Sequence, residues 1–263
     1  MVEFIAEISS NHNGDLDRCR SLIRTAARIG CAGVKFQLFR LERLFAPEIL
    51  KVSPTHRQRR RWELPLYFVP KLSACAREHG LKFGITPFDL DGVDAVQTHV
   101  DFLKVASYEL PWLDLVDRCA DTGLPLMIST GMADAGETWN AAQTALEAGC
   151  TDLTLLHCVS RYPAAEETCN LAAIGTLREL LVREFAPLYE DAELKAGWSD
   201  HSAAPGVIAR AVNHWGCDVV EFHLDLEGEG DEFGGGHCWL PDRIGEVIAG
   251  GFLPVRRDRK SVV

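Results

Sequence analysis

The sequence lacks the features that mark membrane-spanning and disulfide-bonded proteins. No apolar run reaches the length of about 18 residues that a membrane-spanning helix requires. The first residues lead directly into an expected strand, and no signal peptide is recognised there. The nine cysteines are an odd number and form no CxxC pair, which favours reduced, mostly buried thiols over a disulfide framework. We therefore expect a soluble, cytoplasmic protein that makes no contact with a membrane.

Further absences limit the partners and the domain organisation. Positive charge is not in excess, and the net charge of −11 argues against a nucleic-acid binder while leaving room for a local basic pocket. The first expected strand is followed by Ser-Ser-Asn-His-Asn-Gly at residues 9–14, which lacks the GxGxxG pattern of a dinucleotide-binding sheet. No low-complexity linker divides the chain, so residues 1–263 are expected to form one domain.

Short apolar, β-rich runs alternate with segments of helical spacing along the whole chain. Pro111 and Pro241 stand where helices are expected to begin, and Gly30 and Gly80 follow expected helix ends. Eight strand-then-helix units in about 250 residues predict an α/β fold, the (β/α)8 TIM barrel, with an open doubly wound sheet as the alternative. The eight strands are expected near residues 2–8, 33–39, 82–87, 102–106, 125–130, 153–159, 195–199 and 218–224.

Two long connections are expected to be irregular. Residues 40–64 contain the basic run from His56 to Arg61, which is either a solvated loop or a means of attracting anions to the mouth of the barrel. Residues 227–236 are rich in glycine and acidic residues and are expected to be mobile.

Polar side chains stand at every expected strand end, where barrel enzymes carry their reactive groups. Lys35 and Lys104 lie inside apolar strands, so each ammonium either pairs with a carboxylate such as Glu7 or Glu109, binds an anion, or forms a Schiff base. Hydroxyl groups at neighbouring strand ends favour a guest that carries a phosphate and a carboxylate over Schiff-base chemistry. These hydroxyl groups belong to Thr86, Ser129, Ser160 and Ser199.

His201 and His223 end two neighbouring expected strands, each beside an acidic residue. They are either hydrogen-bonded core histidines or the ligands of a divalent metal ion, with Asp200 and Glu221 as acceptors that could fix the ring tautomers. Two imidazoles with open coordination positions suit a Lewis-acidic ion. We expect Mn²⁺ first, with Mg²⁺ or Zn²⁺ as alternatives.

Taken together, the strand-end segments resemble the N-acetylneuraminate (sialic acid) synthase family, whose catalytic domain is a barrel that condenses phosphoenolpyruvate with an N-acetylated aminosugar. Each segment is weak by itself, but eight in order are a specific signal. The resemblance covers nearly the whole chain, through Ala6-Glu7-Ile8 with Asn11-His12-Asn13-Gly14, Lys35-Phe36-Gln37, Thr86-Pro87-Phe88-Asp89, Lys104-Val105-Ala106-Ser107, Ser129-Thr130-Gly131-Met132, His157-Cys158-Val159-Ser160-Arg161-Tyr162-Pro163, Ser199-Asp200-His201 and Glu221-Phe222-His223.

The resemblance implies a role for each strand-end residue. His201 and His223 would hold the metal ion, while Gln37 and Tyr162 would face the sugar. Carboxylates that position water or accept protons would be Glu7, Glu109 and Glu221. Phosphoenolpyruvate would be held by Lys35, Lys104, Thr86, Ser107, Ser129, Ser160 and Ser199. The resemblance also implies a homodimer.

The chain departs from the family pattern in its last third. Phe222 replaces a usual lysine, and a longer loop with Gly234-Gly235-Gly236-His237 stands where Gly-Pro-Asp is expected. Asp231, Glu232 and His237 are candidate replacements for the lost sugar contact. The sequence ends at Val263 without the antifreeze-like domain that usually covers the site, so residues 40–64 and 227–239, or a separate partner, are expected to cover it.

Three functions therefore stay open. The first is phosphoenolpyruvate-dependent synthesis of a nonulosonic acid from a sugar aldehyde. The second is a related 3-deoxy-sugar acid synthase that uses a phosphorylated aldose, which the basic run would suit. The third is a non-catalytic barrel that retains a phosphoenolpyruvate and metal site.

Overall fold

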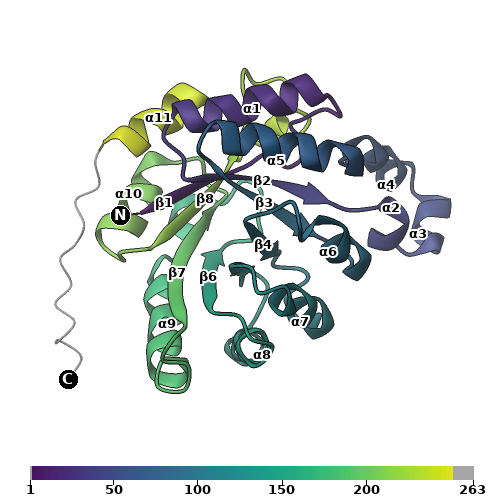
Figure 1. Ribbon diagram of the computed structural model, residues 1–263. Helices are drawn as coiled ribbons and strands as arrows, with labels where there is room; N and C mark the ends of the chain where they lie inside the picture. Colours follow the sequence, from purple (N-terminus) through teal and green to yellow (C-terminus); the bar gives the residue numbers. More distant parts are fainter. Residues whose placement is uncertain (1, 251–263) are drawn as a thin grey trace.

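Each strand pairs in parallel with the next one along the chain, and β8 pairs back with β1. The computed structural model, which describes residues 2–250, is thus a closed barrel (Figure 1). The predicted (β/α)8 architecture is confirmed; residue 1 and residues 251–263 of the expected domain lie outside the described range. The strands are β1 (Glu3–Glu7), β2 (Gly33–Leu38), β3 (Lys82–Pro87), β4 (Phe102–Val105), β5 (Leu126–Ser129), β6 (Asp152–Cys158), β7 (Glu193–Asp200), β8 (Val219–Leu224) and the short β9 (Cys238–Trp239).

Helices surround the barrel, and local capping sets where some of them begin (Figure 1). The Asp15 carboxylate accepts the backbone N–H groups of Asp17 and Arg18 at the start of α1. Asp134 and Glu137 form a capping box at the start of α8. The helices are α1 (Leu16–Arg28), α2 (Leu41–Leu44), α3 (Pro47–Val52), α4 (Pro54–Gln58), α5 (Val69–Glu78), α6 (Leu90–Val96), α7 (Leu113–Asp121), α8 (Ala135–Glu147), α9 (Ala172–Leu180), α10 (Pro205–Asn213) and α11 (Pro241–Ala249). Shorter turns are η1 (Arg59–Trp62), η2 (Leu66–Phe68), η3 (Glu166–Thr168), the π-helical η4 (Leu181–Phe185) and η5 (Phe233–Gly235).

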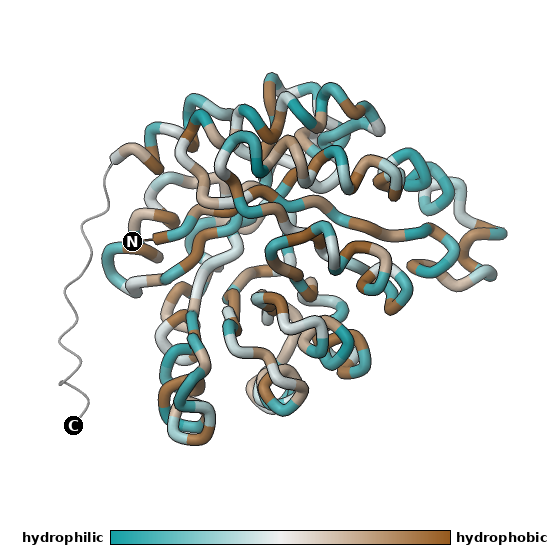
Figure 2. The backbone as a smooth tube through the Cα atoms, in the orientation of Figure 1, coloured by the Kyte–Doolittle hydropathy of each residue, from teal (hydrophilic) through white to brown (hydrophobic). Residues whose placement is uncertain are grey.

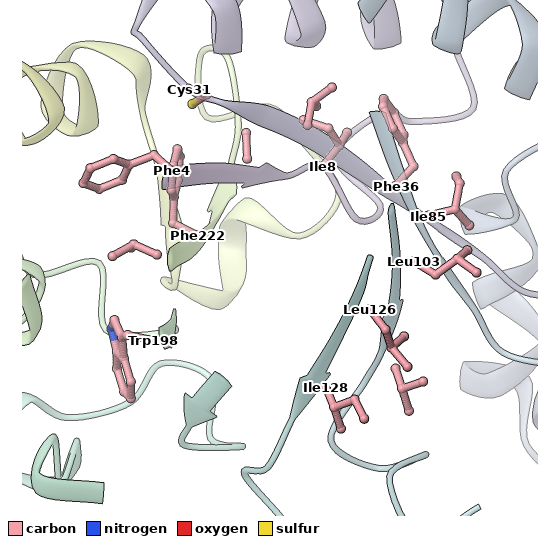
Figure 3. Close-up of a cluster of buried hydrophobic side chains, with 14 of the residues drawn as sticks. Phe4, Ile8, Cys31, Phe36, Ile85, Leu103, Leu126, Ile128, Trp198 and Phe222 are labelled. Atoms are coloured by element: carbon pink, nitrogen blue, oxygen red, sulfur yellow. The ribbon is translucent and has the colours of Figure 1, made fainter. Parts of the chain in front are cut away.

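Hydrophobic and hydrophilic residues follow one another along the backbone (Figure 2). Successive side chains of a strand point to opposite faces, so each strand has one side toward the helices and one toward the barrel interior. Outward-facing side chains such as Phe36, Ile85 and Phe222 belong to the large core between the strands and the helices (Figure 3). A smaller cluster lies inside the barrel, where a side chain at Gly84 would collide with the ring of Phe102. This inner cluster consists of Ile5, Phe102, Met127, Leu156 and Val219.

The barrel interior becomes polar two residues beyond this apolar cluster. Because the side-chain period of a strand is two, the next inward position on each strand points into the same interior, one layer higher. Glu7 follows Ile5 and Lys104 follows Phe102 in this way. Ser129, Cys158 and Glu221 follow the other three members of the cluster. The apolar layer therefore closes the barrel from below and supports a polar layer at the carboxyl ends of the strands.

The two connections that were expected to be irregular have more structure than predicted. Residues 40–64 contain α2, α3, α4 and η1. In the other connection, the Asp225 carboxylate accepts the N–H groups of Gly228 and Gly230, at 2.7 and 3.2 Å. Asn11 Oδ1 accepts the N–H of Glu232 at 2.9 Å. These contacts hold residues 227–236 against the barrel, and their expected mobility stays a prediction. The short strand β9, which pairs with β8, was missed.

All nine cysteines are free and buried, as predicted. Within residues 2–250, no helix combines the length and the apolar character needed to cross a membrane.

Candidate functional site

A cavity of about 840 Å³ opens at the carboxyl ends of the barrel strands. All the predicted site residues except Ser160 line it. The buried Ser160 hydroxyl has no hydrogen-bond partner among the described residues and lies against Gly131, where a Cβ would be 2.7 Å away. The lining residues that the sequence predicted are Glu7, Lys35, Gln37, Thr86, Lys104, Ser107, Glu109, Ser129, Tyr162, Ser199, His201, Glu221 and His223.

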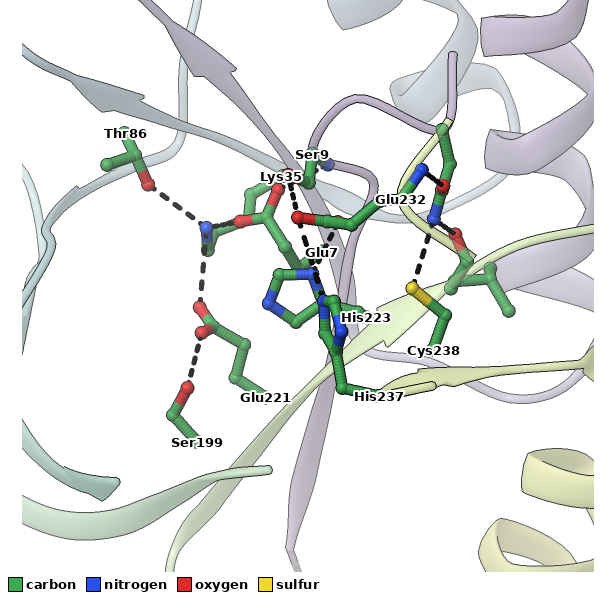
Figure 4. Close-up of polar contacts among 12 residues, drawn as sticks. Glu7, Ser9, Lys35, Thr86, Ser199, Glu221, His223, Glu232, His237 and Cys238 are labelled. Atoms are coloured by element: carbon green, nitrogen blue, oxygen red, sulfur yellow. Dashed lines mark hydrogen bonds and ion pairs between the residues drawn. The ribbon is translucent and has the colours of Figure 1, made fainter. Parts of the chain in front are cut away.

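The bottom of the cavity, here called the floor, is formed by Glu7, Lys35, Lys104 and Glu221. Lys35 contacts Glu7, Glu221 and Thr86 there (Figure 4). It forms an ion pair with Glu7, lies 3.4 Å from Glu221 Oε2, and donates a 3.0 Å hydrogen bond to Thr86 Oγ1. The pairing with Glu7 is one of the two partners considered from the sequence. Burial lowers the pKa of Lys35 to about 7. The ammonium is thus held by neighbouring carboxylates against a large desolvation cost.

Lys104 forms the second buried pair of the floor, with Glu221, which was not among the two carboxylates considered as partners from the sequence. Glu221 also accepts a 2.8 Å hydrogen bond from the Ser199 hydroxyl. Burial acts to raise the pKa of Glu221, but the adjacent Lys104 and Lys35 hold it well below its usual range. The floor therefore holds two lysine amino groups on barrel strands, each beside a buried carboxylate.

Glu109 and Ser129 are lining side chains whose buried polar atoms lack a hydrogen-bond partner among the described residues. Glu109 is partly buried, and its Oε2 accepts no hydrogen bond from any described residue. Burial raises the pKa of Glu109 to about 7, which is suitable for a group that exchanges a proton near neutrality. The Ser129 hydroxyl is likewise buried without a partner among the described residues. Unpartnered buried polar groups that face a cavity are typical of a ligand site.

His201 and His223 lie side by side above the floor, with ring centres 5.3 Å apart. His201 Nδ1 donates to the carbonyl oxygen of Val159, and His223 Nδ1 donates to Glu232 Oε2, both at 2.8 Å. These bonds leave Nε2 of each ring available to a metal ion. Burial lowers the pKa of His201 to about 3, so this ring is neutral, as a metal ligand must be. The donor set therefore fits a divalent cation.

The acceptors that orient the histidines differ from those expected. Asp200 accepts two tryptophan indole N–H groups, and Glu221 pairs with the lysines, so neither contacts a histidine. Glu232 takes this role for His223. His223, Glu232, His237 and Cys238 form a group whose ligand atoms lie within 4.8 Å of one another.

At the mouth of the cavity, sequence reasoning missed Phe45 and Trp62, and it named Arg59 only as part of the basic run and Asp231 and His237 only as candidate sugar contacts. Phe45, Arg59 and Trp62 from the connection after β2 line the cavity, together with Asp231 and His237 from the connection after β8. Both connections that were expected to cover the site thus contribute to its wall. No local pattern marks these residues, because only the folded chain brings the two connections together.

Comparison with known proteins identifies the family. The sequence model of the NeuB family matches residues 22–249. The chain belongs to the NeuB family. An uncharacterized protein of Methanocaldococcus jannaschii is 36% identical over 225 residues, which cover 85% of this chain and 62% of the relative. The N,N'-diacetyllegionaminic acid synthase of Legionella pneumophila is 33% identical over 238 residues, which cover 85% of this chain and 64% of that enzyme.

A solved structure shares the fold of this NeuB-family chain. The N-acetylneuraminic acid (sialic acid) synthetase of Leptospira borgpetersenii, crystallised with citrate, matches with a TM-score of 0.82 at 27% identity. The match covers 94% of this chain and 81% of that chain. Family membership confirms the resemblance seen in the strand-end segments. The chain spans less than two thirds of the length of the two curated relatives above.

Proposed function

We propose that this NeuB-family protein joins phosphoenolpyruvate to a sugar aldehyde and releases inorganic phosphate, as in nonulosonic (sialic) acid synthesis. One observation carries the proposal: a single cavity holds a floor of lysines and hydroxyls below a cluster of histidines. An enol phosphate that also bears a carboxylate needs such a floor. An aldehyde oxygen that must be polarised needs a metal-binding cluster beside it.

The floor suits a small guest with two anionic groups. Lys35 and Lys104 provide two cationic centres whose positions are fixed by strands β2 and β4. The unpartnered hydroxyl of Ser129 supports this assignment, because it could donate a hydrogen bond to a phosphate oxygen. The remaining hydroxyls assigned to phosphoenolpyruvate are those of Thr86, Ser107, Ser160 and Ser199.

The reaction forms one carbon–carbon bond. C3 of phosphoenolpyruvate attacks the aldehyde carbon, and the aldehyde oxygen takes up a proton. Water adds at C2 and loses a proton, and the bond between C2 and the phosphate oxygen breaks to release inorganic phosphate. A divalent metal ion, Mn²⁺ in the first instance, would supply Lewis-acid polarisation of the aldehyde oxygen.

Three carboxyl groups are assigned to positioning water or exchanging protons during this reaction. Glu7 and Glu221 lie in the floor, paired with lysines, where they position water near C2. Glu109 is the group best suited to exchange a proton, because burial raises its pKa to about 7. Gln37 and Tyr162 line the same cavity and are assigned to the sugar. The Tyr162 ring centre lies 4.2 Å from that of His201.

A phosphorylated aldose is a second candidate acceptor, and Arg59 favours it. Arg59 is the one member of the run from His56 to Arg61 that lines the cavity. Its guanidinium lies 5.5 Å from the ring centres of both Phe45 and Trp62 and, among residues 2–250, has no carboxylate within ion-pairing distance. Its neighbours Arg60 and Arg61 are paired with Glu42 and Asp231. An uncompensated guanidinium at the mouth is suited to an anionic group on the acceptor.

The test measures phosphate release from phosphoenolpyruvate with a panel of amino sugars, aldoses and phosphorylated aldoses. Each sugar is assayed once with added Mn²⁺ and once with a chelator in place of the metal. We expect release only with a suitable aldehyde and added metal. Binding of phosphoenolpyruvate without release for any acceptor would favour the non-catalytic alternative. The homodimer implied by the family resemblance stays a prediction, which light scattering checks.

A further inference from the structure

His237 is a third imidazole beside the two proposed metal ligands. Its ring centre lies 4.8 Å from that of His223 and 6.2 Å from that of His201. The residue is 3% exposed, and its side chain lines the cavity (Figure 4). Neither ring nitrogen has a hydrogen-bond partner among the described residues; the Glu232 carboxylate is 3.6 Å from Nε2. An imidazole buried in this way is costly unless a ligand engages it.

The three ring positions agree with those that one ion would require. With metal–nitrogen distances of about 2.0–2.1 Å, imidazoles that share an ion have ring centres roughly 4.5–5.2 Å apart. The separations from His223 to His237 and to His201, 4.8 and 5.3 Å, are close to this range. The remaining separation of 6.2 Å requires a modest inward turn of one ring.

The surroundings of His237 keep its ring within reach of the cavity. A Cβ at residue 235 would lie 2.9 Å from His237 Nδ1, so the glycine there leaves the ring its space. Cys238 is excluded from the ligand set because its thiol lies 3.5 Å from the Asn11 amide and it does not line the cavity. Glu232 holds His223 through Nδ1 and leaves Nε2 of that ring for the ion.

We propose that His237 is a third protein ligand of the metal ion, beside His201 and His223, and that Glu232 is the residue that positions His223. This inference rests on the proposed function in placing an ion at that cluster. The inference also goes beyond the proposed function, because a ligand set of three imidazoles defines the class of ion. Such a site favours Zn²⁺, Co²⁺ or Mn²⁺ over Mg²⁺, which prefers oxygen ligands.

The test is metal binding to the metal-free protein, measured by calorimetry with MnCl₂ and CoCl₂. In His237→Gln we expect one site per chain and at least about tenfold weaker binding of both ions. The visible absorption of bound Co²⁺ should also change, because an oxygen ligand replaces a nitrogen. His201→Ala gives the reference for loss of a ligand, and His214→Gln, exposed just after α10, is the matched control that should bind as the wild type does.

Equal affinity and an unchanged Co²⁺ spectrum in His237→Gln would overturn the proposal. A measurement that needs no variant is the NMR of the histidine ring nitrogens when Zn²⁺ is added to the wild type. Three shifted rings are expected in the cavity, and two would refute the role of His237. These are binding readouts, so their outcome is separate from that of the phosphate-release assay: three ligands without catalysis would refute only the proposed function.

Discussion

The Trp62 indole N–H donates a 2.9 Å hydrogen bond to Asp231 Oδ2. Arg61 Nε lies 3.0 Å from the same oxygen. These contacts join the connection that follows β2 to the connection that follows β8, and both connections line the mouth of the cavity. The two segments therefore form one rim. A rim of this kind limits the access of water to the floor, which strengthens the electrostatic interactions there.

Trp62→Phe tests whether this hydrogen bond holds the rim together. The variant keeps an aromatic ring but loses the donor, and a hydrogen bond to a carboxylate contributes about 1.5–3 kcal/mol. We expect trypsin to cleave several-fold faster after the arginines of residues 40–64, and phosphoenolpyruvate with Mn²⁺ to slow cleavage of the wild type. Trp139→Phe, in α8, is the control and should be cleaved at the wild-type rate. Unchanged cleavage of Trp62→Phe would show that other contacts hold the rim.

Lys104→Met tests the anion-binding floor. Loss of the buried ammonium should weaken phosphoenolpyruvate binding, measured by calorimetry without sugar, by roughly 2–5 kcal/mol. The variant leaves Glu221 with one fewer partner, so thermal unfolding is measured alongside, and the double variant with Glu221→Gln removes the unpaired charge. Lys82→Met is the control, because Lys82 pairs with Glu3 at the opposite end of the barrel. A decrease of less than tenfold in the affinity for phosphoenolpyruvate would mean that Lys104 has only a structural role.

Glu109→Gln tests the raised pKa of this carboxyl group. Burial raises the pKa of this carboxyl group from its ordinary value of 4.5 to about 7 in the folded protein. Between these two pH values the folded state binds more protons than the unfolded state, so the free energy of unfolding must fall as pH rises. The full effect is about 3 kcal/mol at most. Urea unfolding from pH 4.5 to 8 should show this decline in the wild type and in the exposed control Glu78→Gln, but a smaller one in Glu109→Gln. Identical pH profiles would refute the shift.

The floor of the site could be predicted because it obeys the period of a strand. Lys35 and Lys104 each stand two residues beyond a small or apolar inward residue, so alternation alone places them in the barrel interior. The barrel also brings the ends of its strands to one face, which makes His201 and His223 neighbours. Their proximity therefore follows from the fold class, whereas the orientation of their rings depends on the contacts with Val159 and Glu232.

The rim and the third histidine could not be predicted in the same way. Glu232 reaches His223 from within a connection that has no repeating pattern. The strand that carries Trp239 has two residues, too few for a period to show. Contacts such as that between Trp62 and Asp231 depend on how two long connections fold against each other, and residue spacing does not encode this. Accordingly, the sequence identified Glu232 and His237 only as candidate sugar contacts.

Substitution of Arg59 tests whether the acceptor sugar carries a phosphate group. If its guanidinium binds a phosphate on the aldose, Arg59→Gln should raise KM for phosphorylated acceptors by about ten- to a hundredfold, since charge-assisted hydrogen bonds contribute roughly 1.5–3 kcal/mol. KM for unphosphorylated sugars and the affinity for phosphoenolpyruvate should not change, because the floor is untouched. Arg57→Gln is the matched control: Arg57 belongs to the same run but donates to the carbonyl oxygens of Leu50 and Lys51. An equal rise in KM for phosphorylated and unphosphorylated sugars would mean that Arg59 contributes to the shape of the rim but does not recognise a phosphate. No rise for either class would remove the reason to prefer a phosphorylated acceptor.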